Sequence, residues 1–331
     1  MKSRIIKRIL YCLLAIFIIF IMLMITPRTW SALNPDKPPV GYHYLAPTYL
    51  AIGMGLEQLI NRRPEVPDDI REIKNIEYKK INDKSLQLDL YKLKNQTEAA
   101  PLLVFIHGGG WKSGERADYL VYLIAFAKKG YVTATVSYRL RDIAPYPACA
   151  EDITDAVKWF FRNGSQYGYD PDRIALVGGS AGAHLALLAA YGWKKRGINP
   201  GTLVDSVPQH HIKAVVDIYG PTDLTTEFSR NNSTVTGFLA KTYAEAPDLF
   251  VEASPVHYLS RNNPPTMILH GTSDQIVPVS QSDFLKYKLD SLGVPNVYYK
   301  VPFWPHTMDI VKRVNRFSEA KMTSFFEKYL K

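Results

Sequence analysis

The chain of 331 residues is long enough for one large α/β domain or two small ones, and its 47% hydrophobic content supports a sizeable core. The formal net charge of +9 is unevenly placed, because five basic residues and no acidic one lie within residues 1–28. Removing those five leaves 35 of the 40 basic residues against 31 acidic ones. These are scattered without a basic stripe, which argues against nucleic acid as a partner.

An apolar run, "ILYCLLAIFIIFIMLMI", fills residues 9–25 and carries no charge. As a helix it would be about 25 Å long, slightly shorter than a hydrocarbon core is thick. Four basic residues precede it and no convincing cleavage site follows, so we expect residues 1–28 to form a cytoplasmic basic tail and a transmembrane signal anchor. Positive residues favour the cytoplasmic side, which would leave the rest of the chain extracytoplasmic. The alternatives are a cleaved secretory signal and, less consistent with the basic cluster, a buried core helix.

Residues 29–69 are expected to form a linker and an amphipathic cap helix. The stretch "SALNPDKPPVGYHY" is rich in proline and is typical of a linker. Five apolar residues then recur at spacings of four and three: Leu45, Tyr49, Ile52, Leu56 and Leu59. They predict a short helix ending near Asn61. Because the opposite face is not strongly basic, we expect this stripe to pack on the main domain rather than lie on a membrane surface.

Residues 70–331 are expected to form one α/β domain. Short runs typical of strands recur along it: "LQLDLYKL", "PLLVFIHG", "YVTATVSY", "RIALVGG", "IKAVVDIYG", "PTMILHG" and "NVYYKV". Helical periodicity appears between them, in "ADYLVYLIAFAKKG", "AEDITDAVKWFFRNG" and "AGAHLALLAAYGWKK". This alternation predicts a mostly parallel central sheet flanked by helices on both faces, with ligands at the carboxyl ends of the strands. Residues 221–260 break the rhythm and are the expected insertion near the site.

The stretch "LVGGSAGAHLALL" holds the strongest chemical signal. Gly178-Gly179-Ser180-Ala181-Gly182 fits G-x-S-x-G between a strand-like run and an apolar helix, which is the context that this motif requires. The serine would occupy a sharp turn beside a helix amino terminus, which stabilises negative charge. We therefore predict a nucleophilic serine here, the alternative being a plain glycine turn. Neither a P-loop nor G-x-G-x-x-G fits the glycine clusters, so nucleotide binding is a poor competitor.

A serine hydroxyl is a weak nucleophile and needs a base that an acid orients. Asp274 lies in "ILHGTSDQIVP" at the end of a strand-like run, and His306 lies in "VPFWPHTMD" after another. With Ser180 they follow the order Ser, Asp, His. We predict Asp274 as the acid over Asp217 or Asp223, by its placement at a strand end. Three other histidines are weaker candidates for the base because of their positions: His270, His184 and His257.

The glycines of "VFIHGGGWKSGER" follow another buried strand-like run. Attack by a serine on a carbonyl creates an oxyanion, which needs donors already aimed at it. We predict that the backbone amides of Gly109, Gly110 and Ala181 supply them, and that side chains on the two glycines would block the approach. His107 belongs to the same loop and is expected to brace it. A tight glycine turn without a ligand is the alternative.

These blocks together resemble the α/β-hydrolase superfamily, particularly its hormone-sensitive-lipase-like and feruloyl/acetyl esterase-like carboxylesterases. "HGGGW", "SYRL" with "YPACAEDI", "GGSAGAH", "IYGPTDL", "HGTSDQIVP" and the final His306 are similar to that family's successive blocks, in order, over residues 76–331. The resemblance implies Ser180 as nucleophile, His306 as base, Asp274 as orienting acid and a metal-independent acyl-serine intermediate. One block departs from the lipase-like pattern, since "RLRDIAPYPA" stands where "RLAPEHPFPA" is usual.

The expected function is a membrane-anchored serine carboxylesterase that needs no cofactor or metal. Its substrate would be a small-molecule, glycan or lipid ester, and its other partner the bilayer around the amino-terminal helix. An amide-directed hydrolase, such as an arylformamidase or a peptidase, would use the same three residues. An inactive hydrolase fold used for binding is a further alternative, but it predicts a degraded catalytic position, and none is degraded.

Overall fold

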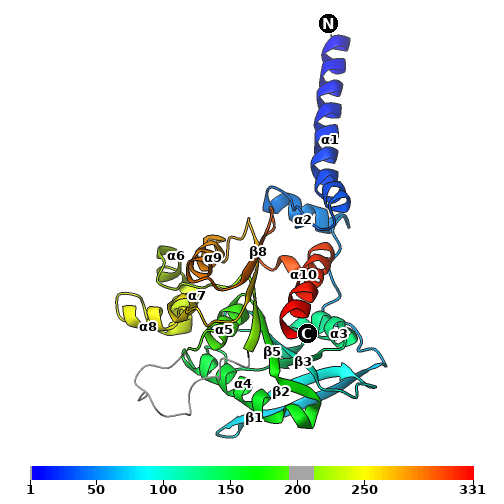
Figure 1. Ribbon diagram of the computed structural model, residues 1–331. Coiled ribbons are helices and arrows are strands. Elements are labelled where there is room, and N and C mark those ends of the chain that lie inside the picture. Colours follow the sequence, from blue (N-terminus) through cyan, green and yellow to red (C-terminus); the bar gives the residue numbers. More distant parts are fainter. Residues whose placement is uncertain (1, 194–211) are drawn as a thin grey trace.

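The computed structural model describes residues 2–193 and 212–331, which form a central sheet between helices with one long helix standing apart (Figure 1). Within these residues one eight-stranded sheet has the order β1-β2-β4-β3-β5-β6-β7-β8. The strands are β1 (Ile70–Ile81), β2 (Lys84–Leu93), β3 (Ala100–Ile106), β4 (Val132–Val136), β5 (Tyr169–Gly179), β6 (Ile212–Ile218), β7 (Thr266–Gly271) and β8 (Asn296–Val301). The strands β1 and β2 pair antiparallel with each other, and β2 pairs antiparallel with β4. All other pairs are parallel, which confirms the predicted mostly parallel sheet.

Helices cover both faces of this sheet. One layer holds α4 (Ala148–Tyr167), α5 (Ala181–Ala190) and α9 (Ser280–Leu292), and the other holds α3 (Leu120–Lys128) and α10 (Lys312–Leu330). Successive side chains of a strand point to opposite faces, so Val104 of β3 packs in the first layer and Phe105 in the second. A strand buried on both faces has to be apolar throughout, which explains the continuous apolar run of β3.

Two stretches of residues 70–331 differ from the sequence-based expectation. The strand β1 was not among the predicted strands, because its polar residues obscure the alternation of an edge strand. The helix expected to reach Lys195 ends at Ala190, and the part of that prediction on residues 194–195 lies outside the described residues. Residues 221–260 fold into short helices: α6 (Glu227–Arg230), α7 (Ser233–Leu239), α8 (Pro247–Glu252) and the 3₁₀ helix η3 (Pro255–Tyr258).

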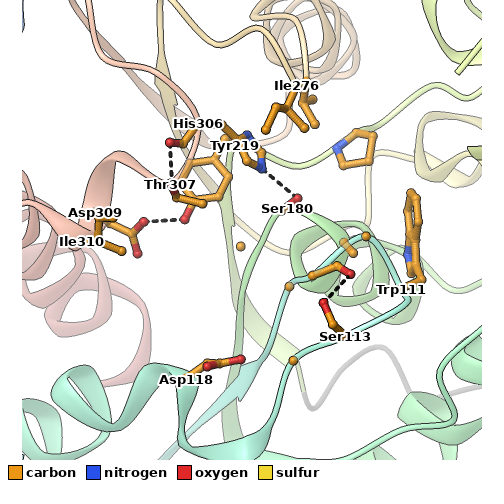
Figure 2. A pocket seen from close by; sticks show the side chains of 18 of the residues that line it. Trp111, Ser113, Asp118, Ser180, Tyr219, Ile276, His306, Thr307, Asp309 and Ile310 are labelled. Atoms are coloured by element: carbon orange, nitrogen blue, oxygen red, sulfur yellow. Dashed lines mark hydrogen bonds between the residues drawn. The ribbon is translucent and has the colours of Figure 1, made fainter. Parts of the chain in front are cut away.

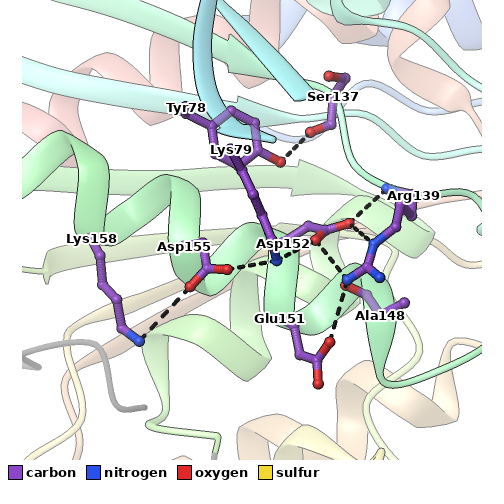
Figure 3. A network of polar contacts seen from close by, with 9 residues as sticks. All are labelled: Tyr78, Lys79, Ser137, Arg139, Ala148, Glu151, Asp152, Asp155 and Lys158. Atoms are coloured by element: carbon purple, nitrogen blue, oxygen red, sulfur yellow. Dashed lines mark hydrogen bonds and ion pairs between the residues drawn. The ribbon is translucent and has the colours of Figure 1, made fainter. Parts of the chain in front are cut away.

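A buried carboxylate fastens α4 to the edge of the sheet (Figure 3). Asp152 of α4 accepts hydrogen bonds from Lys79 of β1 at 2.8 Å and from the Arg139 side chain at 2.7 Å. The Asp152 side chain is fully buried, whereas Asp155, which also pairs with Lys79 at 2.6 Å, is 39% exposed. Asp152 therefore links the edge strand, the loop after β4 and α4 into one unit.

The amino-terminal helix α1 (Lys2–Leu33) is longer than the apolar run that predicted it and continues through Pro27. Proline in a helix interior removes one backbone hydrogen bond. Pro27 lies two residues after the end of the apolar run, so the lost hydrogen bond is near that end. Residues 4–33 are long and apolar enough to cross a membrane and lie almost entirely outside the protein interior. A signal sequence would have the same length and composition.

The helix α2 (Leu45–Gly53) requires a correction of its predicted length and of its predicted packing face. It ends eight residues before Asn61, because Met54 caps it and Gly55 takes a left-handed φ of +71°. Tyr49 is 64% exposed, although it belongs to the stripe expected to face the domain. The residues that α2 buries are instead Thr48 and Ala51.

Candidate active site

Ser180 lies in the sharp turn between β5 and α5. Its backbone has φ +55° and ψ −123°, a conformation that non-glycine residues rarely adopt and that costs about 1–3 kcal/mol. The Ser180 amide donates to the Ile218 carbonyl of the neighbouring strand at 2.9 Å, which helps hold the turn. Glycines make the turn possible, because a Cβ on Gly178 would overlap the backbone of Gly182, and one on Gly182 the Ile106 carbonyl. The turn therefore presents the hydroxyl at the carboxyl edge of the sheet.

The structure brings Ser180, His306 and Asp274 together in one hydrogen-bonded chain. The Nε2 atom of His306 lies 2.9 Å from the Ser180 Oγ, and its Nδ1 lies 2.6 Å from the Asp274 Oδ2. Since a carboxylate only accepts, Nδ1 carries the proton and donates it to Asp274, which leaves Nε2 of a neutral ring to accept from the serine hydroxyl. The three residues follow β5, β7 and β8 at one edge of the sheet, which is the spatial reason for their wide separation in sequence.

Asp274 is held ionised by its surroundings. Its Oδ1 accepts from the amides of Ile276 at 2.8 Å and Val277 at 2.9 Å, and the His270 Nε2 lies 3.2 Å from Oδ2. Burial would raise the pKa of Asp274, but hydrogen bonds from His270 and His306 outweigh it and hold that pKa well below its usual value. A carboxylate that stays charged keeps the His306 ring in one tautomer and orientation.

The loop that holds the predicted oxyanion donors Gly109 and Gly110 lines the same pocket as Ser180 (Figure 2). Gly109 and Gly110 have φ values of +104° and +59°. Among the described residues, no hydrogen bond uses the amides of Gly109, Gly110 or Ala181. A Cβ on Gly109 would overlap the Ser113 carbonyl, and one on Gly110 would lie 3.1 Å from Thr234, so the loop's own folding requires glycine. The crowding within the protein is thus one reason for these glycines, and the block that side chains here would present to the substrate stays a prediction.

The loop is braced from beneath by aromatic residues. His107 stacks on Tyr138 with ring centroids 4.3 Å apart, and the Tyr138 hydroxyl donates to the His107 carbonyl at 2.9 Å. Trp111 donates from Nε1 to the His184 Nδ1 at 3.3 Å and stacks on Phe238 of α7. Burial lowers the pKa of His184 to about 4 and also lowers that of His107. Both histidines are therefore neutral structural residues.

The rival acids and bases of the sequence analysis lie away from the Ser180 hydroxyl and serve the fold. His270 is buried between Ser282 and Val277, while His257 is exposed. Asp223 accepts from the Thr225 amide and hydroxyl within its own loop. Asp217 is fully buried below the site, and burial raises its pKa to about 7. None of the four forms a hydrogen bond with His306 among the described residues.

Sequence reasoning missed two residues beside His306, the predicted base. The Tyr219 ring lies 4.6 Å from the His306 ring, and its hydroxyl donates to Asp309 (Figure 2). Tyr219 has a φ of +49° just past the end of β6, and burial raises the pKa of Asp309. The sequence signal that could have identified Tyr219 is its position at the end of a predicted strand. Nothing in the sequence links it to Asp309, which lies in the 3₁₀ helix η4 (Met308–Ile310).

A pocket of about 870 Å³ opens in front of these residues. Apolar side chains from the insertion and from the loops after β7 and β8 line part of it: Phe228, Val235, Ile276 and Ile310. Charged side chains also line the pocket, with Arg62 and Arg63 paired to Asp118 at 2.8 and 3.2 Å. Within the described residues, no group of three or more His, Cys, Asp or Glu is placed to hold a metal ion.

The sheet order, the strand-to-helix turn at Ser180 and the edge where the three residues meet define an α/β-hydrolase fold. Solved esterase structures share it. A truncated carbohydrate esterase from gut microbiota has a TM-score of 0.67 at 23% identity, covering 82% of this chain and 98% of that one. The propionate-bound esterase 2 of Thermogutta terrifontis has a TM-score of 0.66 at 23% identity, covering 81% and 97%.

The profile of the BD-FAE family matches residues 88–289, more than half of the chain, so the chain belongs to that family. Among curated relatives, it is 31% identical to Esterase LipQ of Mycobacterium tuberculosis over 69% of this chain and 55% of that protein. It is 29% identical to Esterase LipC of the same organism over 76% of this chain and 64% of that protein. The chain thus spans between half and two thirds of the length of these relatives.

Proposed function

We propose that the protein is a membrane-anchored serine carboxylesterase that hydrolyses carboxylic esters through an acyl-serine intermediate. The observation that carries the proposal is the chain of hydrogen bonds from Ser180 through His306 to Asp274, at 2.9 and 2.6 Å. Its membership of the BD-FAE family and its similarity to proteins named as esterases support the same chemistry.

In the proposed reaction, His306 Nε2 removes the hydroxyl proton as Ser180 Oγ attacks the ester carbonyl. The free amides of Gly109, Gly110 and Ala181 donate to the oxyanion, and Asp274 stabilises the imidazolium that forms. The tetrahedral intermediate expels the alcohol, which takes the proton from His306. Water then attacks the acyl-serine with the same base, releases the acid and restores the hydroxyl.

The proposed anchor is α1, retained after synthesis with the catalytic domain extracytoplasmic. Its last turns support retention because they are part of the folded contacts. Met24 is buried, and the Ser31 hydroxyl accepts from the Val40 amide at 3.1 Å and from Arg313 of α10 at 2.8 Å. The stretch "TWSA" at residues 29–32 is a weak candidate for the cleavage that a secreted form requires, and cleavage there would remove Met24 and Ser31 from these contacts.

The substrate is proposed as an ester of a small molecule, a glycan or a lipid. The 870 Å³ pocket has the volume of a small-molecule site, and its apolar wall suits an acyl group while its charged side chains suit a polar one. The similarity to LipQ and LipC adds only that these two relatives are esterases.

The test is hydrolysis of p-nitrophenyl acetate, butyrate and a long-chain ester by the full-length protein in detergent, beside Ser180→Ala. Loss of the nucleophile should lower kcat by roughly 10⁴-fold or more. The control is Ser324→Ala, which changes an exposed serine on α10 and should leave the rate unchanged. Equal rates for Ser180→Ala and the unsubstituted protein would contradict the proposal, and turnover of amides alone would favour the amide-directed alternative.

A further inference from the structure

The segment around α2 presents an uncharged apolar surface to solvent. Residues 44–56 contain no Asp, Glu, Lys or Arg. Four large side chains of this segment are exposed, and we call them the α2 face: Tyr44 (68%), Tyr49 (64%), Leu50 (43%) and Met54 (55%). A helix on the surface of a soluble domain normally carries charged residues on its exposed side. A group of large apolar side chains exposed on one uncharged segment is typical of an interaction surface.

The buried side of α2 is fixed to α1 and not to the sheet core. Ala51 packs with Tyr42 and with Met24 of α1 in a small cluster of its own. The Tyr42 hydroxyl lies 3.3 Å from the Met24 carbonyl and 3.1 Å from Glu57. In Figure 1, α2 lies beside the foot of α1. These direct contacts therefore fix the position of the α2 face relative to the length of α1.

The catalytic body is fastened to the same point. Arg313 of α10 donates from Nε to both Glu57 oxygens, at 3.0 and 2.9 Å, and lies 4.7 Å above the Trp304 ring. Trp304 in turn donates to the Pro39 carbonyl at 2.9 Å. These contacts tie α1, α2 and the loop carrying the base into one unit, so the body cannot turn freely about the anchor.

We infer that the α2 face lies in the interfacial layer of the bilayer that α1 crosses, with lipid as its occupant. The inference depends on the anchoring in the proposed function. The apolar stretch of α1 is followed by Arg28 and Trp30, residue types that favour the membrane–water boundary, and α2 is held at that end of the helix. Tyrosine also favours this boundary, because its ring is apolar and its hydroxyl polar, and Tyr44 and Tyr49 are both exposed there.

Docking of the α2 face would orient the active-site pocket as well. The chain that leaves α2 forms one wall of the pocket through Ile60, whose amide donates to the Ile310 carbonyl at 2.9 Å. A bilayer that holds the α2 face therefore holds this wall close to the lipid surface.

The test places a fluorophore on the α2 face in the full-length protein, reconstituted into phosphatidylcholine vesicles that contain nitroxide-labelled lipid. Leu50→Cys in a Cys12→Ser background offers one reactive thiol, because Cys149 is buried and burial raises the pKa of its thiol. The matched control is Arg162→Cys, an exposed position on α4 at the opposite end of the molecule from α1 (Figure 1). The unsubstituted chain, labelled at Cys12 within α1, reports insertion of the anchor by itself. Matching far-UV circular dichroism shows that the variants are folded.

We expect shallow nitroxide lipids to remove at least about half of the fluorescence at position 50, as for a side chain buried in the headgroup layer, and little of it at position 162. Equal quenching at positions 50 and 162, with strong quenching at Cys12, would overturn the inference while leaving the anchor intact. No quenching at Cys12 would instead overturn the anchoring and the docking together. A probe at position 50 that is shielded without lipid quenching, and that cross-links between copies, would assign the α2 face to a second copy of the chain and overturn the inference.

Discussion

Asp217 offers a test of the electrostatics beneath the active site. Its carboxyl is fully buried, and Oδ1 accepts from the Gly220 amide at 2.7 Å, while Oδ2 has no hydrogen-bond partner among the described residues. Burial raises the pKa of Asp217 from 3.8 to about 7. Between these two values the folded protein holds a proton that the unfolded chain has already released. A neutral acid that does not contact His306 cannot orient the base.

The sign and size of the effect follow from this difference. From pH 3.8 to about 7 only the unfolded state ionises, so the free energy of unfolding falls as the pH rises through this interval. Each pKa unit corresponds to about 1.36 kcal/mol, so the whole interval corresponds to at most roughly 4 kcal/mol. About two of these units lie above pH 5, so about 2–3 kcal/mol of the loss occurs between pH 5 and pH 8.

Asp217→Asn keeps the acceptor for Gly220 and cannot ionise. Urea denaturation of the full-length variant and of the unsubstituted protein in the same micelles, at pH 5 and at pH 8, gives the difference in their free energies of unfolding. We expect this difference to change by roughly 2–3 kcal/mol in favour of the variant as the pH rises. A difference that is the same at both pH values would refute the reasoning, since it would mean that Asp217 has one protonation state throughout.

Two further predictions concern the oxyanion loop and the polar network of α4. Gly109→Ala should lower kcat by about 10²–10³-fold, because a Cβ would displace the loop against Ser113, whereas Gly130→Ala, also at positive φ but facing open space, should leave kcat unchanged. Esterase assays of both variants decide this, and an unaltered kcat for Gly109→Ala would contradict it. Asp152→Ala should cost about 3 kcal/mol in urea denaturation, because it removes the buried partner of Lys79 and Arg139 and leaves them only the more exposed Asp155 and Glu151; Asp155→Ala should cost at most about 1 kcal/mol. Similar losses for these two variants would refute the distinction.

The fold and the candidate triad could be predicted because their signals are local or topological. The turn at Ser180 requires Gly178 and Gly182, and all three residues lie within five consecutive positions, so the sequence shows the turn as a motif. Asp274 and His306 were found through the rule that parallel strands present their carboxyl ends at one edge, where the structure places both. Their catalytic roles stay predictions until the Ser180→Ala assay is made.

Contacts between distant segments could not be predicted in the same way. Tyr219 follows β6 and Asp309 lies in η4, and they meet only because the sheet brings both beside His306. The face of α2 was misjudged for a different reason. Periodicity of large apolar residues usually marks the buried side, but close packing on Met24 and Tyr42 selects the small Ala51, which leaves Tyr49 exposed.

The loop after β8 connects the amino-terminal segment to the predicted base, His306. Gly41 donates to the Pro302 carbonyl at 2.7 Å, and a Cβ on Gly41 would lie 2.7 Å from the Phe303 oxygen, so the two backbones are in close contact. Trp304, bonded to Pro39, lies two residues before His306. The predicted domain boundary at residue 70 stays a prediction, but residues 39–41 contact the loop that carries the base. Arg313 of α10 donates to Ser31 at 2.8 Å as well, so both α10 and the loop that carries His306 contact the amino-terminal segment, and a shift of that segment would act on the position of His306.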